Sequence, residues 1–129
     1  MKDFAICEFG YDLSRRCDQI RPVYCHDESC QKTVPEAITA FLEGESFEDV
    51  IRTAVSLGGD CDTLTCIAGS LASAYYGIPD WMKHKAMAYL NEEMIEVIEQ
   101  FERKKEMMKK NLIELVFILD RSGSMSGLE

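Results

Sequence analysis

The sequence predicts an all-α fold that ends in a short strand-like tail. Between residues 33 and 103, apolar side chains recur at helical spacing, and capping residues or glycines mark most segment ends. Residues 112–119 break this pattern with an almost continuous apolar run, which is typical of a buried strand. We therefore expect a helical part at 1–103, a charged linker at 104–111 and a strand-like tail at 112–129.

The first 33 residues show little periodicity and are predicted to form loop, with one short helical turn near Leu13–Cys17. The first long helix is expected to start at Thr33. Thr33 and Glu36 have the spacing of a capping box, in which each side chain bonds the backbone of the other. Gly44 follows the apolar pattern and should end this helix.

Four further helices follow in the sequence. Ser46 and Asp49 repeat the start signal, and Gly58 and Gly59 should stop the second helix. The third, 62–76, carries so many small residues that neighbouring backbones can approach closely, and we expect it to be the most buried helix. A shorter helix is expected at 80–90, and Asn91 can cap the last one.

We call Gly58–Thr63 the elbow, because it joins two predicted helices. Three oxygen-bearing side chains follow its glycines within four residues: Asp60, Asp62 and Thr63. Aspartate at a helix start is most often a cap, which binds free backbone N–H groups. Two carboxylates and a hydroxyl also form part of an oxygen cage for a hard cation such as Mg²⁺. The spacing leaves both readings open, and capping is the commoner one.

Composition narrows the function classes. The chain has 129 residues, enough for one domain, and its net charge of −9 opposes non-specific binding of nucleic acid. Its apolar runs fall short of the ~20 residues that span a membrane. The first residues lack the apolar stretch of a signal peptide, so we expect a cytoplasmic protein whose six cysteines are reduced.

The elbow and the small-residue helix after it resemble the signature of the ADP-ribosylglycohydrolase family. The resemblance covers about residues 8–103, in the order found at the C-terminal end of that family. It also rests on these segments: Gly10-Tyr11-Asp12, Ile20-Arg21-Pro22, Ser29-Cys30-Gln31, Val34-Pro35-Glu36-Ala37, Phe41-Leu42 and Tyr76-Gly77-Ile78-Pro79.

The resemblance implies an all-helical hydrolase that uses two Mg²⁺ ions to cleave the bond between ADP-ribose and an acceptor. It would make Asp60, Asp62 and Thr63 metal ligands, and it would place Tyr11 and Asp12 near the substrate. The substrate would be an ADP-ribosylated protein or a small molecule containing ADP-ribose.

The sequence departs from the family in one respect. Members of the family carry a second ligand set, a Thr-Asp-Asp run in their N-terminal half, and no such run occurs here. We therefore expect catalysis to need an N-terminal half supplied by a separate polypeptide. The alternative is an inactive helical fragment, produced by gene fusion or truncation, with a structural or interaction role.

The tail carries a second candidate metal motif. Asp120, Ser122 and Ser124 follow the apolar run in the pattern Asp-x-Ser-x-Ser, which resembles the opening of a von Willebrand factor A domain. That resemblance implies three oxygen ligands for Mg²⁺ at the end of a strand. A third hypothesis is therefore a metal-dependent adhesion or scaffold module, which is the weakest because only the start of such a domain is present.

Overall fold

The computed structural model describes the backbone of residues 2–27 and 29–123 and the side chains of residues 2–27 and 29–109. All regular secondary structure within these ranges is helical, which confirms the all-α expectation. The helices are α1 (Lys2–Phe9), α2 (Cys17–Ile20), α3 (Cys30–Glu43), α4 (Phe47–Ser56), α5 (Cys61–Tyr76), α6 (Asp80–Met87) and α7 (Glu92–Gly123). The chain divides into two compact units, Met1–Met82 and Lys83–Glu129, which are described separately.

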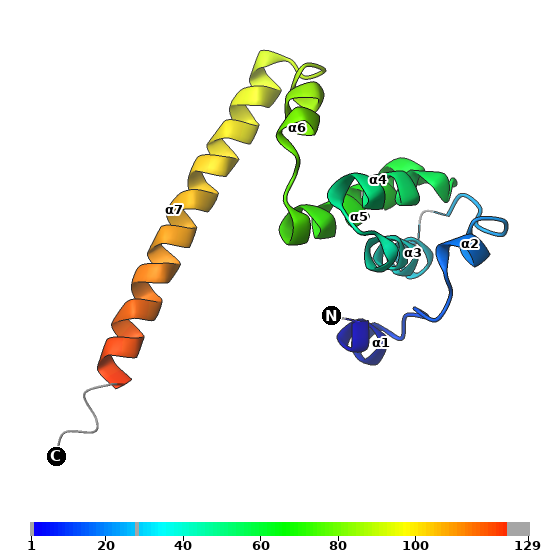
Figure 1. Cartoon of the computed structure of the whole chain (residues 1–129), viewed down its shortest axis with the longest axis horizontal. Helices are drawn as coiled ribbons and strands as arrows, with labels where there is room; N and C mark the ends of the chain where they lie inside the picture. Colours follow the sequence, from blue (N-terminus) through cyan, green and yellow to red (C-terminus); the bar gives the residue numbers. More distant parts are fainter. Residues whose placement is uncertain (1, 28, 124–129) are drawn as a thin grey trace. The chain divides into compact units, whose positions relative to one another are not determined.

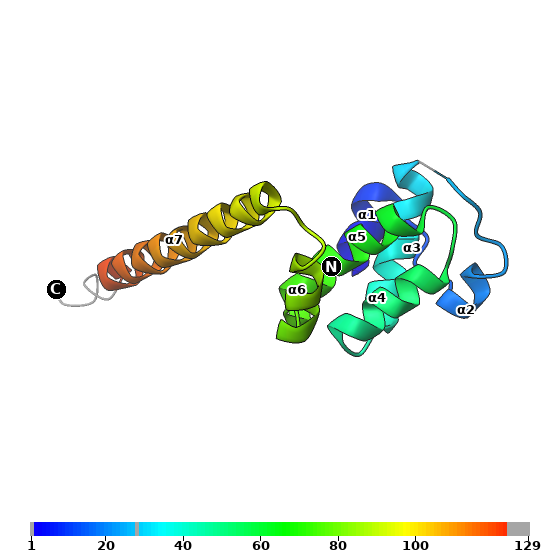
Figure 2. The same ribbon diagram turned by 90° about the horizontal axis from the view of Figure 1, so that it is seen from above.

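The core of the first unit lies where α3, α4 and α5 pack against one another, with α2 against α3 (Figures 1 and 2). Small side chains let the helices approach closely, since a Cβ on Gly69 of α5 would lie 2.9 Å from Ile51 Cδ1 of α4. Each buried Val, Leu or Ile side chain stabilises the fold by roughly 1.5–3 kcal/mol. The fully buried core residues are Ile20, Ala37, Ala40, Val50, Ala54, Leu64, Ala68 and Ala72.

The most buried helix is α3, so the expectation that α5 would hold this place was wrong. Buried residues of α3 are Thr33 and the unbroken run Pro35–Ala40, whereas those of α5 are Leu64, Ala68 and Ala72. The reason is position. Helix α3 contacts α2, α4 and α5, and its Ile38 also packs with Ala5 of α1.

Helix α3 begins one turn earlier than the sequence suggested. It starts at Cys30 after Ser29, and the Thr33 hydroxyl donates to the Asp27 carbonyl at 2.9 Å instead of capping. Glu36 does not complete a capping box, because its carboxylate pairs with Arg15. The capping-box pattern at Thr33 was therefore misleading, since both side chains have tertiary partners.

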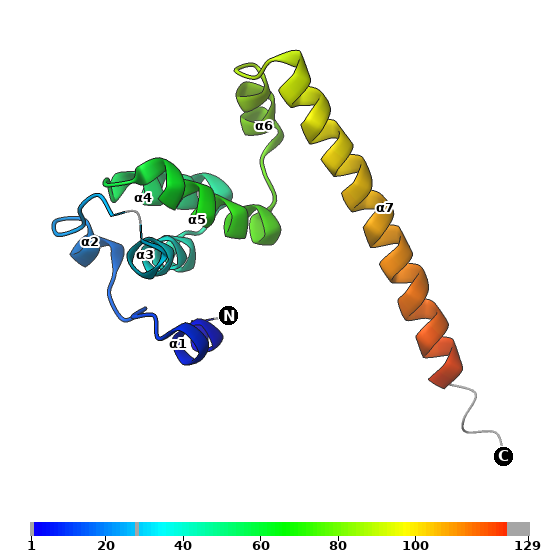
Figure 3. The same cartoon turned by 180° about the vertical axis from the view of Figure 1, so that it is seen from behind.

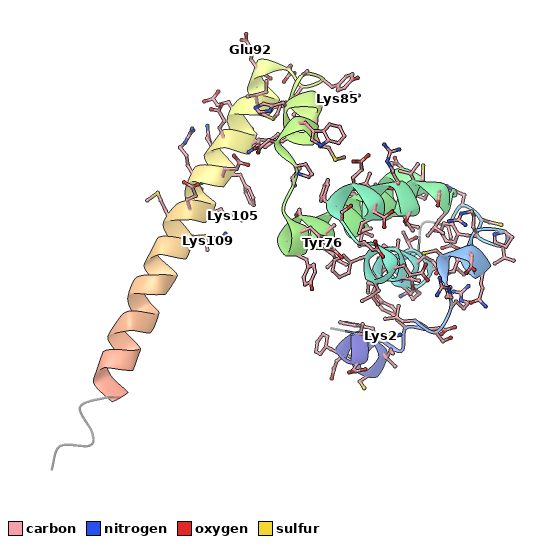
Figure 4. All side chains as sticks on the ribbon, in the orientation of Figure 1. Lys2, Tyr76, Lys85, Glu92, Lys105 and Lys109 are labelled. Atoms are coloured by element: carbon pink, nitrogen blue, oxygen red, sulfur yellow. The ribbon has the colours of Figure 1, made fainter. Side chains whose placement is uncertain are left out.

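Other local signals were confirmed. The Asp49 N–H donates to Ser46 Oγ at 3.2 Å at the start of α4, and the Met94 N–H donates to Asn91 Oδ1 at 2.9 Å at the start of α7. Gly44 follows the last residue of α3, as expected. The Tyr76 hydroxyl at the end of α5, labelled in Figure 4, donates to the Gly44 carbonyl at 2.6 Å and ties the two helix ends together.

The first 33 residues are more helical than expected. Helix α1 buries only Ala5, while Phe4, Ile6 and Phe9 stay exposed, so it has no apolar stripe that would reveal a helix in the sequence. The expected turn near Leu13–Cys17 forms slightly later, as α2, where Cys17 and Ile20 are buried.

The second unit corrects the prediction of a strand. Helix α7 runs without a break from Glu92 to Gly123, so the backbone of residues 112–119 is helical (Figure 3). The segment expected as a charged linker, 104–111, also lies within this helix, where Lys105 and Lys109 are exposed (Figure 4). The physical reason is that a lone strand leaves its backbone groups without partners, whereas a helix bonds them within the segment.

Two further findings bear on the function classes. All six cysteines carry free thiols, and Cys17 is the buried one among them. Burial and the neighbouring Glu43 carboxylate raise the pKa of the Cys17 thiol to about 12. Among the residues that the structure describes, no helix combines the length and the apolar content that crossing a membrane requires.

Candidate functional site

The elbow owes its shape to two glycines in left-handed conformations. After α4 ends at Ser56, Gly58 has φ +75° and Gly59 has φ +62°. A Cβ on Gly59 would lie 2.6 Å from Tyr24 Cε1 and 3.0 Å from the Cys25 carbonyl oxygen. Glycine is therefore required at position 59 both for its backbone conformation and for the close approach of the Tyr24–Cys25 segment.

The elbow brings two carboxylates together at the start of α5. Asp60 occupies the N-cap position, but its side chain makes no capping hydrogen bond. Instead it interacts with Asp62, and this side-chain hydrogen bond is the main cause that lowers the pKa of Asp62. The backbone N–H groups of Thr63 and Asp62 lower that pKa further, and His26 adds a favourable charge interaction. The capping reading of Asp60 is thus wrong for its side chain.

Thr63 follows in the first turn of α5 and is exposed, like Asp62. Two adjacent carboxylates repel each other unless a proton or a cation lies between them. Their oxygens, with the Thr63 hydroxyl nearby in sequence, are the ligand type that Mg²⁺ prefers. These residues fit one side of a Mg²⁺ site, because Mg²⁺ needs about six ligands in octahedral geometry. Within the described residues, no group of three or more His, Cys, Asp or Glu side chains gathers around one point.

A cavity of about 630 Å³ borders the elbow. Tyr24 and His26 line it, and these are the residues that contact Gly59 and interact with Asp62. Tyr11 and Asp12, which the sequence suggested for substrate contact, line it as well. The structure therefore places both sets of sequence-predicted residues around one neighbourhood.

An ion-pair network crosses the wall of this cavity. The Arg15 guanidinium lies 2.5 Å from Glu36 Oε1, and its Nε lies 3.6 Å from Asp12 Oδ2. Burial raises the pKa of Glu36, and Arg15 opposes that rise. The Ser14 hydroxyl and N–H donate to Asp12 Oδ1 at 2.6 and 3.0 Å, and these bonds lower the pKa of Asp12.

A second ion pair lines the cavity near its mouth. Lys32 Nζ lies 2.8 Å from Asp27 Oδ2 and is the main cause that lowers the pKa of Asp27. Sequence reasoning missed the roles of Arg15, Tyr24 and Glu36. The partners of Arg15 and Glu36 stand 21 residues apart, and no local pattern signals such a pair.

The second candidate motif was not tested in the same way. The backbone of Asp120 and Ser122 belongs to α7, but their side chains, and the whole of Ser124, lie outside the described residues. The proposed von Willebrand factor A-like metal site therefore stays a prediction.

Comparison with known proteins agrees with these features. Residues 11–111 match the ADP-ribosylglycohydrolase family. The human ADP-ribosylhydrolase ARH3 is 39% identical over 77 residues, which are 60% of this chain and 20% of that protein. The enzymes of the same name from Bos taurus and Mus musculus are each 38% identical over 77 residues, so the match spans about a fifth of these relatives. No solved structure matches the chain. The chain therefore belongs to the ADP-ribosylglycohydrolase family.

Proposed function

We propose that this chain supplies the Asp60–Asp62–Thr63 side of a Mg²⁺ site in an enzyme that hydrolyses the bond between ADP-ribose and its acceptor. The observation that carries the proposal is the interaction of the Asp60 and Asp62 carboxylates at the start of α5. In a member of this family, such a pair supports a metal-binding role better than a capping role, since Asp60 caps nothing.

The residues of the chain would act by binding and positioning. Asp60 and Asp62 would concentrate negative charge at the elbow, and the Thr63 hydroxyl would add a neutral oxygen ligand. Bound Mg²⁺ would supply the positive charge that holds ribose hydroxyls and polarises a water molecule near the anomeric carbon. Gly59 and Tyr24 keep the elbow in shape, because the ring packs directly on the glycine.

The remaining ligands would come from another part of the family fold. The described residues place two carboxylates at the elbow, and the matched segment spans 20% of human ADP-ribosylhydrolase ARH3. We propose that a region corresponding to the N-terminal part of the family completes the site, on a separate polypeptide. The substrate would be an ADP-ribosylated protein or a small molecule carrying ADP-ribose. Six free thiols suit a reducing compartment, and we propose the cytoplasm.

A complementation assay tests this function. The full chain is incubated with Mg²⁺ and an ADP-ribosylated protein, with and without the N-terminal region of human ADP-ribosylhydrolase ARH3. Release of ADP-ribose is expected in the complemented reaction only. Asp60→Asn with Asp62→Asn should abolish the release, whereas Asp80→Asn, in the first turn of α6, should preserve it. Undiminished release by the Asp60/Asp62 double variant, or no release from the complemented parent, would contradict the proposal.

A further inference from the structure

Glu36 leaves one carboxylate oxygen without a partner in the wall of the cavity. Its side chain is 5% exposed, and Oε1 accepts a hydrogen bond from Arg15 Nη2. Oε2 is buried and has no hydrogen-bond partner among the described residues. A buried acceptor left unsatisfied costs free energy, so this oxygen favours the arrival of a donor.

A second buried polar atom lines the same cavity. The Tyr24 hydroxyl is covered by protein and has no hydrogen-bond partner within the described part of the chain. A carboxylate oxygen only accepts, while a tyrosine hydroxyl can donate or accept. A ligand hydroxyl serves either atom, because it too both donates and accepts.

The charges around the cavity disfavour an anionic ligand group. Arg15 is engaged by Asp12 and Glu36, and Lys32 is engaged by Asp27. A phosphate carries acceptors almost exclusively at neutral pH and has nothing to donate to Glu36. The lining therefore favours the hydroxyl-bearing parts of a ligand over its phosphates.

The cavity has the size and position for such a ligand. Its volume of about 630 Å³ is typical of small-molecule sites. Tyr24 packs on Gly59 and His26 interacts with Asp62, so the cavity and the elbow are adjacent. We propose that this cavity binds a ribosyl group and that Glu36 accepts a hydrogen bond from one of its hydroxyls. The inference rests on the proposed function, since ribosyl groups carry the hydroxyls of ADP-ribose.

Access requires one side chain to move. Neighbouring protein atoms cover both orphan oxygens, so a ligand cannot reach them in the arrangement described. Arg15 contacts Glu36 and is 41% exposed, which makes it the residue that can swing toward solvent.

Binding of neutral sugars without metal tests the proposal. The ¹⁵N-labelled full chain is titrated in EDTA, with amide chemical shifts as the readout, at millimolar concentrations of four probes. Adenosine and 2′,3′-dideoxyadenosine report on the adenosine ribose, and methyl riboside and its 2,3-dideoxy analogue report on the terminal ribose. We expect at least one hydroxylated probe to bind about tenfold more tightly than its dideoxy counterpart, as a hydrogen bond to a charged group predicts.

Variants assign that preference to Glu36. Glu36→Gln should make the hydroxylated and dideoxy probes bind equally weakly, whereas Glu43→Gln, on the same helix but outside the cavity, should keep the preference. Tyr24→Phe removes only an oxygen atom and should reduce the preference. If Glu36→Gln fails to fold, Tyr24→Phe decides the question, and an unchanged preference in it overturns the proposal.

The outcomes separate this inference from the metal site. Asp60→Asn should keep the hydroxyl preference in EDTA while it removes any response to Mg²⁺. Absence of a hydroxyl preference in the parent chain, or its persistence in Glu36→Gln, overturns the ribosyl site whatever the Mg²⁺ result. Failure of the complementation assay with an intact hydroxyl preference would instead overturn the proposed hydrolase function alone.

Discussion

Gly59 lies directly beneath the ring of Tyr24, so closely that a Cβ on the glycine would stand 2.6 Å from Tyr24 Cε1. The two residues are far apart in sequence, and their contact joins the loop before α3 to the turn before α5. Because Tyr24 also lines the cavity, this contact links the position of the carboxylate pair to the shape of the neighbouring pocket.

Substitution of the two elbow glycines should separate backbone strain from this contact. Gly58 and Gly59 both have left-handed φ values, but a Cβ on Gly58 would meet nothing within 4 Å. Gly58→Ala should cost about 1–2 kcal/mol for the left-handed conformation. Gly59→Ala should cost a further ~1–3 kcal/mol from overlap with Tyr24. Urea denaturation of both variants measures the difference, and equal losses of stability would show that the Tyr24 contact has no weight.

Much of the local structure could be predicted from sequence, because its causes are local. The cap at Ser46 and the glycine elbow depend on residues within one turn of each other. The pair Arg15–Glu36 could not be predicted, since it depends on how α3 packs against a distant loop. The α3 start was misplaced for the same reason, because Thr33 prefers a tertiary partner over a cap.

The candidate site was predicted in part. The elbow residues Asp60 and Asp62 were identified from spacing and resemblance, and the structure brings their carboxylates together. The cavity beside them was not, although Tyr11 and Asp12 were correctly placed on one wall in the neighbourhood of the elbow. A cavity is made by non-local packing, and its buried polar atoms become visible only when the covering residues are known.

Mg²⁺ should stabilise the chain if the elbow binds it. A ligand that binds the native state alone raises the free energy of unfolding by RT ln(1 + [L]/Kd). We therefore expect millimolar Mg²⁺ to raise the thermal midpoint of the parent chain. Asp60→Asn with Asp62→Asn should abolish the rise, while Asp80→Asn should leave it unchanged. A midpoint that ignores Mg²⁺ in the parent would show that this half of the site does not bind metal by itself.

Two carboxyl groups should make the stability depend on pH in opposite directions. Burial raises the pKa of Glu36 above its ordinary 4.5, so the folded chain holds that proton more tightly than the unfolded chain. The parent should therefore lose stability relative to Glu36→Gln as pH rises from 4.5 through the folded pKa. Lys32 lowers the pKa of Asp27 below its ordinary 3.8, so the stability advantage of the parent over Asp27→Asn should exist above 3.8 and vanish on acidification below it.

Chemical denaturation of the parent and both variants at several pH values measures these trends. The two variants serve as controls for each other, because a general effect of pH on the fold would move both comparisons in the same direction. Parallel curves for the parent and Glu36→Gln across this range would mean that the buried carboxyl titrates as it does in the unfolded chain.

Gly69 tests how tightly α4 and α5 cross. A Cβ at this position would lie 2.9 Å from Ile51 Cδ1, the flexible end of a side chain, so a small group can be accommodated by a shift of Ile51. A leucine cannot, and Gly69→Leu should destabilise the chain by ~1–3 kcal/mol through overpacking. Ser70→Leu, at an exposed position of the same helix, controls for helix propensity and added hydrophobicity. Thermal and urea denaturation should show a large loss for Gly69→Leu and a change within about 0.5 kcal/mol for Ser70→Leu, as is usual at surface sites. Equal stability of the two variants would mean that the helices separate at this crossing without cost, which the burial of Val50, Ala54 and Ala68 around it argues against.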